Sequence, residues 1–250
     1  MKINVHRQHT TGKLLKSKTA IARYQALRYY LSMNTTEIYS VIHILREEYK
    51  TWKTPAVTIL AQCEKSPYKI LVSCIISLRT KDDVTAQASA RLFDHAGTPA
   101  AMTGLSADEI ARLIYPAGFY RNKSVQILEI SRRLLSEYDG RVPEDIDELL
   151  KFKGVGRKTA NLVVTLGFGH PGICVDTHVH RICNRWGYVA TKIPEETEIA
   201  LRKKLPAEYW IEINDLLVAF GQNHCHPVSP RCSSCRLAVY CSRLGVKVSR

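Results

Sequence analysis

Apolar residues recur along this chain at intervals of three and four positions, which is the spacing of an α-helix with one buried face. The first clear pattern starts after Asn34, which can cap a helix, with Glu37 at the third helical position. The apolar stripe that follows consists of Ile38, Val41, Ile42, Leu45 and Tyr49. We therefore predict that a helix begins close to residue 34.

Similar patterns continue to residue 220, and most carry their own start signal. Ser106 and Glu109 form a capping box, and Asp82 or Asp83 can cap a helix that runs to His95. The remaining predicted helical segments are 66–76, 122–138, 146–152, 158–166, 177–186, 195–205 and 209–220. Because no Asn-Gly or Asp-Gly turn joins two alternating apolar runs, the sequence predicts an all-α fold.

Within the segment 122–138 one apolar face is predicted from four positions. They are Val125, Leu128, Leu135 and Tyr138. We expect this face to pack on the core.

Composition narrows the possible settings of this fold. The chain has 250 residues and is 45% apolar, which allows one large domain or two smaller ones. It has no run of 18 apolar residues and no apolar stretch after Met1, so we expect neither a membrane span nor a secretory signal. A cytoplasmic, reducing setting follows, in which eight cysteines are less suited to disulfides.

The chain is strongly basic, with a net charge of +13. A charge of this size favours a polyanionic partner, and nucleic acid first. Residues 1–33 are basic and free of acidic residues, so we interpret them as an extension of the domain. They suit a flexible nucleic-acid-binding arm or an organelle transit peptide, and a translation start at Met33 is a third interpretation.

A glycine-hinged pair of helices is predicted at residues 146–166. Gly154 and Gly156 flank Val155 between the two helices, where glycine permits a positive φ and the close approach of another backbone. The amides of the turn point outward with the start of the second helix, and Arg157 adds charge there. Such a helix-hairpin-helix can bind the DNA backbone without reading its sequence.

Lys158 and Asp176 are the candidates for chemistry. Lys158 opens the second helix of the hairpin, where the helix dipole and the charges of Lys153 and Arg157 are expected to favour its neutral amine. A neutral lysine can attack carbon and form a Schiff base. Asp176 is expected to cap the next helix as a carboxylate, which could stabilise a sugar cation. From these residues alone, phosphate contact for Lys158 and a purely structural cap for Asp176 remain alternatives.

Four cysteines lie close together near the C-terminus with the spacing C-x6-C-x2-C-x5-C. They are Cys225, Cys232, Cys235 and Cys241. Thiols at this spacing can converge on one metal site, and the spacing leaves zinc and an iron–sulfur cluster both open. The other four cysteines lie in apolar surroundings and are predicted to be small buried residues; they are Cys63, Cys74, Cys174 and Cys183.

Together, these motifs resemble the endonuclease III family of DNA glycosylases. The matching strings are Gly-Val-Gly-Arg-Lys-Thr-Ala-Asn at 154–161, Val-Asp-Thr-His at 175–178, Cys-Asn-Arg at 183–185 and the four-cysteine spacing. The resemblance implies that the cysteines hold a [4Fe-4S] cluster. It further implies that Lys158 is the nucleophile and Asp176 its essential carboxylate.

The resemblance also implies how the chain is divided. Two helical domains are expected to flank a DNA-binding cleft, with residues 1–33 outside them. Residues 34–54 would form a helix that packs with the cluster domain. Residues 55–168 would form a helical barrel that contains the hairpin, and residues 169–250 the cluster domain.

The expected activity is that of a bifunctional glycosylase and AP lyase of base excision repair. It would flip oxidised pyrimidines out of duplex DNA, or act at abasic sites, through a Lys158 Schiff base and β-elimination. The resemblance places DNA contacts at Gly154, Gly156, Arg157 and His178. We expect a monomer in the cytoplasm, associated with the nucleoid, with organelle targeting by residues 1–33 left open.

Two more residues are candidates for filling the space that a flipped base leaves. Arg79 stands where the family usually has glutamine, in Ser77–Asp82, and arginine can bind guanine through two hydrogen bonds. We therefore hypothesise a preference for lesions opposite guanine, with phosphate contact as the alternative role. Phe119 stands where the family places an apolar intercalator, and an ordinary core phenylalanine is the alternative.

Three other functions are compatible with parts of this pattern. A mismatch or other-lesion glycosylase could use the same scaffold. A non-catalytic helix-hairpin-helix protein would bind DNA without needing Lys158 and Asp176. An electron-transfer iron–sulfur protein would not explain the basic charge or the hairpin.

Overall fold

The computed structural model describes residues 33–52, 54–63 and 65–250. All regular secondary structure in these ranges is helical, and no strand is present in them. The all-α prediction is confirmed. No helix in the described ranges combines the length and apolarity that a bilayer span needs. Apart from Met33, the predicted N-terminal extension lies outside the described residues.

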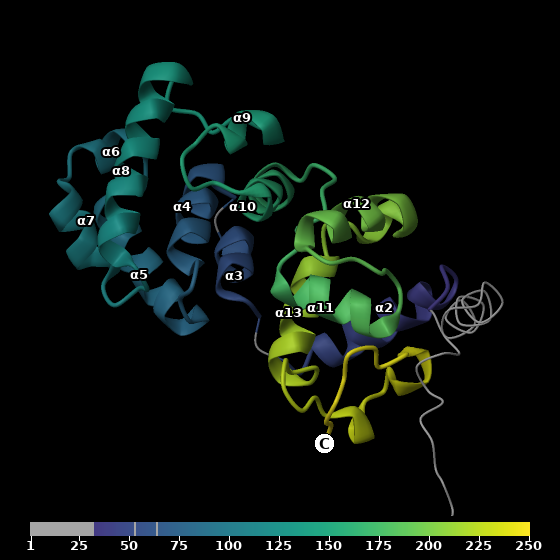
Figure 1. Ribbon diagram of the computed structural model, residues 1–250. Coiled ribbons are helices and arrows are strands. Elements are labelled where there is room, and N and C mark those ends of the chain that lie inside the picture. Colours follow the sequence, from purple (N-terminus) through teal and green to yellow (C-terminus); the bar gives the residue numbers. More distant parts are fainter. Residues whose placement is uncertain (1–32, 53, 64) are drawn as a thin grey trace, which may run out of the picture.

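The helices form two groups that lie side by side (Figure 1). The first group contains α3 (Ala56–Cys63), α4 (Pro67–Ser77), α5 (Asp82–His95), α6 (Pro99–Thr103), α7 (Ala107–Ile114), α8 (Tyr120–Glu137), α9 (Ile146–Leu150) and α10 (Arg157–Leu162), which continues as a π-helical turn, Val163–Gly167. The second contains α2 (Glu37–Tyr49), α11 (Thr177–Trp186), α12 (Pro194–Lys204), α13 (Ile213–Asn223) and three short 3₁₀ turns, Ala207–Tyr209, Cys232–Ser234 and Ala238–Tyr240.

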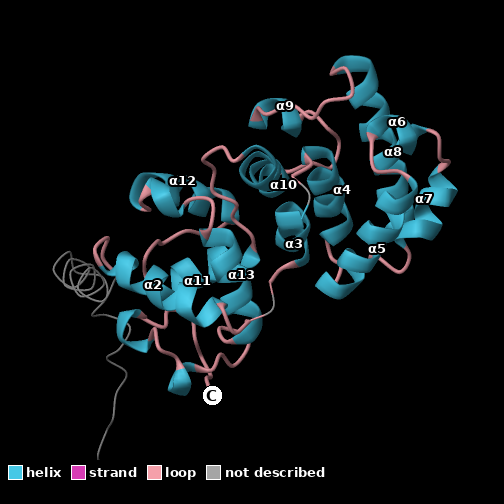
Figure 2. Ribbon diagram, turned by 180° about the vertical axis from the view of Figure 1, so that it is seen from behind, coloured by secondary structure: helices cyan, strands magenta, loops and turns pink. Residues whose placement is uncertain are grey.

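Each group encloses its own apolar core. In the first, α4 lies at the centre, and every residue from Ile70 to Ile76 is buried. In the second, α2 packs on α13, so the start of the described chain and its C-terminal third share one core around Trp186. Figure 2 shows the same grouping from behind. The first turn of α10, from the first group, and that of α11, from the second, lie at the space between the groups.

Local sequence signals account for many of the helix ends. Asn34 and Glu37 exchange hydrogen bonds of 2.8 Å between side chain and backbone, as a capping box requires. Ser106 and Glu109 form a second capping box before α7. Asp145 caps α9 by accepting from the amides of its second and third residues. The capping boxes predicted at Asn34 and Ser106 are confirmed, although α2 itself begins at Glu37, and each cap satisfies amides that have no partner within the helix.

Several expectations about helices are wrong. Asp82 begins α5 instead of capping it, and the cap residue, Lys81, makes no capping hydrogen bond through its side chain. On α8 the predicted face is rotated, because Val125 is 59% exposed while Ile127 and Leu134 are buried. The helices α3 and α6 were not predicted.

Candidate functional site

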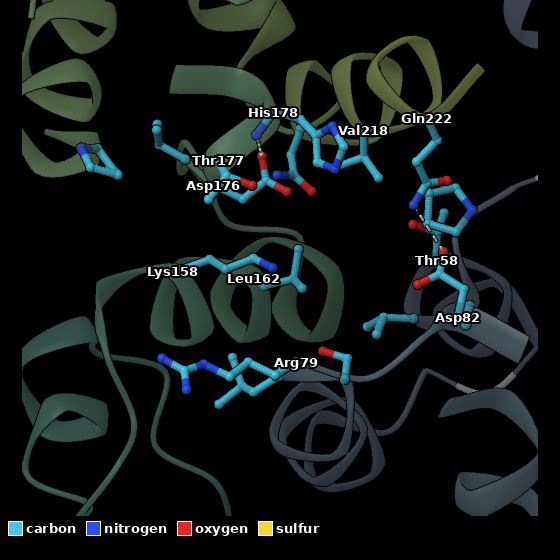
Figure 3. Close-up of a pocket in the computed structure, with 18 of the residues that line it drawn as sticks. Thr58, Arg79, Asp82, Lys158, Leu162, Asp176, Thr177, His178, Val218 and Gln222 are labelled. Atoms are coloured by element: carbon cyan, nitrogen blue, oxygen red, sulfur yellow. Dashed lines mark hydrogen bonds between the residues drawn. The ribbon is translucent and has the colours of Figure 1, made fainter. Parts of the chain in front are cut away.

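A cleft of about 600 Å³ lies between the two helix groups. Its lining brings together Lys158 and Asp176, which lie 18 positions apart in sequence, and adds Arg79 and His178. Figure 3 shows Lys158 and Asp176 facing the same space from opposite walls. Arg157 lines it as well, so five of the predicted site residues share one cavity.

Lys158 enters the cleft from the helix-hairpin-helix. Phe152 and Val155 are buried beneath the turn, while Gly154 and Gly156 are exposed. Gly154 has a φ of +81°, which requires glycine. A Cβ built on Gly156 would meet no atom within 4 Å, so the space beside Gly156 is open. Packing within the protein thus requires glycine at the first position and leaves room at the second.

Asp176 caps α11 and is held in place by that role. One of its carboxylate oxygens accepts hydrogen bonds from the amides of His178 at 2.8 Å and Val179 at 2.9 Å. The remaining carboxylate oxygen is not part of this cap. The predicted N-cap is confirmed, and it fixes the carboxylate at the cleft wall opposite the hairpin.

The expectation that Lys158 favours its neutral amine is wrong for the protein without DNA. Burial acts to lower the pKa of Lys158, but neighbouring acidic groups, the Asp176 carboxylate among them, act in the opposite direction and prevail, so this pKa is raised. The expectation had relied on the helix dipole and on repulsion from Lys153 and Arg157, and the charge of Arg157 is directed to Glu198. Lys158 therefore stands in the cleft as an ammonium, which must lose a proton before it can attack carbon.

Arg157 is paired with a buried carboxylate on the opposite helix group. Its guanidinium donates to Glu198 of α12 through two hydrogen bonds of 2.9 and 2.7 Å. Glu198 is only 2% exposed and also accepts from Arg202 at 3.1 Å. Sequence reasoning missed this ion pair, since 41 residues separate its partners. It connects the hairpin to α12 beside Lys158.

His178 lies against α13 and contacts a cationic neighbour. Its Nδ1 is 3.2 Å from the Arg181 guanidinium. A Cβ at Gly221 would come within 2.2 Å of the same ring nitrogen, so glycine on α13 makes room for the imidazole. Burial first, and then the charge of Arg181, lower the pKa of His178 against the attraction of Asp176. A lowered pKa favours the neutral ring.

The far end of the cleft joins the two helix groups through polar contacts (Figure 3). Gln222 of α13 donates to Asp82 of α5 at 3.4 Å. Thr58 of α3 donates to Asp215 of α13 at 2.7 Å. These hydrogen bonds border a polar end of the cavity, whereas Leu162 and Val218 supply apolar surface.

The four C-terminal cysteines line one pocket beside the second core. They are Cys225, Cys232, Cys235 and Cys241. All eight cysteines are free thiols, and no group of three or more His, Cys, Asp or Glu side chains in the described residues is arranged to hold a single metal ion. Of the four other cysteines, Cys63 is exposed, which corrects the prediction of burial; the remaining three are buried.

Hydrogen-bond donors point at the sulfur atoms of this pocket. Buried Arg185 donates to Cys225 Sγ at 3.4 Å and to the carbonyl oxygens of His226 and Pro227. The amide of Arg243 donates to Cys241 Sγ at 3.4 Å. Donors of this kind stabilise sulfur that carries negative charge, as it does when it ligates iron or zinc. The donor set therefore fits a tetrathiolate metal site.

Arg79 and Phe119 lie together at the edge of the first helix group. Both are exposed, and both have a left-handed backbone, with φ of 53° and 56°. The Arg79 guanidinium lies 5.5 Å from the centre of the Phe119 ring. The alternative of a core phenylalanine is wrong, because Phe119 is 60% exposed.

This combination of an α-helical fold, a glycine-hinged hairpin and a lysine facing a carboxylate defines the class of helix-hairpin-helix base excision repair proteins. Residues 72–207 match the HhH-GPD superfamily of base excision DNA repair proteins. The chain is 47% identical over 178 residues to endonuclease III of Thermotoga maritima, covering 71% of this chain and 84% of that protein. It is 38% identical over 176 residues to endonuclease III of Escherichia coli, covering 70% and 83%.

A solved structure of a trapped endonuclease III–DNA covalent intermediate is similar, with a TM-score of 0.73 and 32% identity, over 84% of this chain and 96% of that one. A non-covalent endonuclease III–DNA complex gives a TM-score of 0.74, again at 32% identity, over 84% and 95%. The chain belongs to the endonuclease III family within the HhH-GPD superfamily. The resemblance inferred from the motifs is confirmed.

The ion pair of Arg157 with Glu198 predicts a pH-dependent contribution to stability. Burial alone would raise the pKa of Glu198, but the hydrogen bonds from Arg157 and then Arg202 prevail and lower it. The pair therefore stabilises the fold above the ordinary glutamate pKa and loses this effect as the pH falls through the lowered value. Glu198→Gln should cost about 3 kcal/mol at pH 7, because it leaves two guanidinium groups without their buried counter-charge.

Urea unfolding of wild type and variant at pH 7 and pH 4 measures this effect. The difference between them should be smaller at pH 4. Glu195→Gln is the control, an exposed residue of the same helix, and should cost less than about 0.5 kcal/mol. Equal costs for the two variants at pH 7 would show that the pair does not stabilise the fold.

Proposed function

We propose that this DNA glycosylase/AP lyase of base excision repair forms a Schiff base through Lys158, with Asp176 as the carboxylate that stabilises the sugar cation. The observation that carries this proposal is the position of the two side chains on opposite walls of one cleft. A non-catalytic DNA-binding protein would have no need of this pairing. Damaged duplex DNA and abasic sites are the substrates we propose.

The chemistry follows from the two side chains. Once deprotonated, the Lys158 amine attacks C1′ of the flipped nucleotide, and the bond from C1′ to the base breaks as the base takes up a proton. Positive charge develops on the sugar, and the fixed carboxylate of Asp176 lies in the same cleft to stabilise it. The C1′–O4′ bond then breaks as O4′ takes up a proton and the nitrogen of Lys158 loses one, which opens the sugar and leaves an imine at C1′. Loss of a proton from C2′ of this imine expels the 3′ phosphate from C3′, which cuts the strand.

Positions of the DNA contacts are proposed from the exposed backbone of the hairpin. Gly154 and Gly156 are exposed, and the open space beside Gly156 allows a phosphate to approach the amides of the turn. Arg157 can add a positive potential, although its side chain is anchored to Glu198. His178 lines the cleft on the opposite wall, where a flipped nucleotide could reach it.

We propose oxidised pyrimidines as the preferred lesions, on the family resemblance. The cleft fits a polar base, because Thr58, Asp82 and Gln222 line its far end. We also propose the cytoplasm as the compartment and a monomer as the active form. The bacterial relatives from Thermotoga and Escherichia support the first of these.

We propose that Cys225, Cys232, Cys235 and Cys241 hold a [4Fe-4S] cluster. The four-thiol donor set and the donors from Arg185 and Arg243 support this assignment. When bound, the cluster would tie the C-terminal loops to α11. We also propose the domain limits 55–168 for the barrel and 169–250, with 34–54, for the cluster domain, and the presence of two separate apolar cores supports this division.

Borohydride trapping on duplex DNA with an abasic site tests the nucleophile. Wild type should give a covalent adduct, and Lys158→Met should give none, because the amine is missing. Lys151→Met is the control, a surface lysine in the same hairpin that pairs with Glu148, and it should trap normally. Asp176→Asn should keep the cap but slow trapping by about a hundredfold, because it removes the charge.

Asp145→Asn changes the cap of α9 in the same way outside the cleft, and it should leave the trapping rate unchanged. Adduct formation by Lys158→Met would contradict the proposed nucleophile. Equal trapping by the two Asp→Asn variants would contradict a role for the Asp176 charge.

Iron analysis of the purified protein tests the cluster. We expect about four iron atoms per chain, and Cys232→Ser should lose iron and solubility because one ligand is missing. Cys63→Ser, at an exposed cysteine outside the pocket, should retain both. Zinc in place of iron, or a soluble Cys232→Ser protein of normal stability without iron, would count against this proposal.

Excision opposite guanine and opposite adenine tests the role of Arg79. If Arg79 binds the opposite guanine, Arg79→Gln should reduce the guanine preference by roughly tenfold, since a bidentate contact discriminates by about 1–3 kcal/mol. Arg121→Gln, at an exposed arginine on α8, should leave the ratio unchanged. An unchanged ratio in Arg79→Gln, with both rates lowered alike, would instead assign Arg79 to phosphate.

A further inference from the structure

Lys123 is a buried lysine without a counter-charge among the described residues. It lies on α8, is 5% exposed, and donates to three oxygens: the carbonyls of Ile76 and Leu78 at 2.7 and 2.6 Å, and Thr80 Oγ1 at 2.9 Å. Burial of an ammonium is costly, and here it lowers the pKa of Lys123 to about 8. A lysine held at this cost by three oxygens from one short segment has a specific structural task.

The three oxygens belong to the end of α4 and the loop that follows it. Carbonyl groups in the last turn of a helix lack partners and carry partial negative charge, so a cation stabilises them. Thr80 is one residue beyond Arg79, whose backbone is left-handed. Lys123 therefore determines the path of the chain on both sides of Arg79.

The second loop, residues 116–119, is attached to the first at the same point. Thr80 Oγ1 also accepts from the amide of Gly118 at 3.0 Å. A Cβ at Gly118 would come within 2.4 Å of the Arg79 carbonyl oxygen, so only glycine allows the two loops this close. The next residue, Phe119, carries the ring that the Arg79 guanidinium faces.

Both exposed side chains are thus supported by one buried amine. The amide of Lys123 also donates to the Phe119 carbonyl at 3.1 Å, because α8 begins directly after Phe119. Without the amine, two carbonyls and one hydroxyl in the loops would lose a charged donor. The left-handed backbones of Arg79 and Phe119, which are unfavourable for non-glycine residues, would then lose the contacts that impose them.

We propose that Lys123 is a positioning residue that holds the loops of Arg79 and Phe119 as one rigid wedge for opening the base stack. The proposal rests on the proposed function, and it adds a residue that does not touch DNA. A wedge ordered during folding does not lose loop entropy when DNA binds. The effect of Lys123 should be confined to substrates in which the base stack of the duplex must be opened.

Four variants test the wedge. Lys123→Met keeps the length of the side chain without the amine. Thr80→Val removes the hydroxyl that both loops share, and Thr80→Ser retains it. Lys204→Met is the matched control, because Lys204 also donates to two carbonyls, those of Met33 and Tyr188, but lies in the second core.

Two activities separate the wedge from the chemistry. One is single-turnover excision of an oxidised pyrimidine from duplex DNA, and the other is borohydride trapping on a single-stranded abasic oligonucleotide. Lys123→Met and Thr80→Val should excise at least about tenfold more slowly, since misplaced groups cost rate, and should trap single strands as wild type does. Thr80→Ser and Lys204→Met should excise as wild type does. Hydrogen exchange should show loss of amide protection at 77–81 and 117–119 in Lys123→Met but not in Lys204→Met.

The wedge is overturned if Lys123→Met and Thr80→Val excise from duplexes as fast as Lys204→Met, or if they lose both activities equally. Where Lys123→Met fails to fold, the contrast between Thr80→Val and Thr80→Ser decides the same question. Wild type that does not trap abasic DNA would reject the proposed function. Hydrogen exchange does not depend on activity. In that case, it would still test whether Lys123 supports the two loops.

Discussion

The placement of Lys158 opposite Asp176 is the constraint on which the rest of the structure depends. Lys158 is carried by α10, whose buried residues belong to the first core, and Asp176 caps α11, whose buried residues belong to the second. Neither core contains both side chains. Their approach across the cleft is therefore a property of how the two helix groups pack, and contacts between the groups act directly on the chemistry.

Polar contacts between the groups surround this pair. Arg157, next to Lys158, binds Glu198 of α12, while Asp82 and Thr58 bind Gln222 and Asp215 of α13. A buried charge without its partner costs several kcal/mol, so such pairs favour the one arrangement of the groups in which they form. This gives a reason why an arginine in a hairpin that we propose to face DNA is directed to a carboxylate of its own chain.

The charges in the cleft also determine the protonation state of Lys158 in the protein without DNA. The raised pKa of Lys158 means that the amine is protonated before DNA binds. Formation of the proposed Schiff base would then need a deprotonation within the cleft. The same carboxylate that raises the pKa of Lys158 is the one proposed to stabilise the sugar cation, so one charge serves both stages.

Sequence patterns predicted the features that depend on neighbouring residues. The caps made by Asn34, Ser106 and Asp176 are local, and the sequence alone was enough to locate them. The short helices α3 and α6 have few turns and little periodicity, so they escaped detection. The face of α8 was misplaced because Val125 and Leu135 are apolar but exposed, and apolar character alone does not determine burial.

The sequence indicated which residues line the candidate site, but it did not indicate how those residues interact. Motif spacing pointed to Lys158, Asp176 and the four cysteines, yet the partner of Arg157 and the state of Lys158 depend on residues brought close only by folding. Lys123 gave no signal at all, because a lysine in a helix is ordinary until its burial is known.

Mass spectrometry of the borohydride-reduced adduct tests the central claim most directly. Wild-type protein is trapped on an abasic duplex and then digested. The modified peptide is then sequenced. The account predicts that the deoxyribose remnant is bonded to the Nζ of Lys158 and to no other amine. A remnant on a different lysine, or on the N-terminal amine, would contradict it.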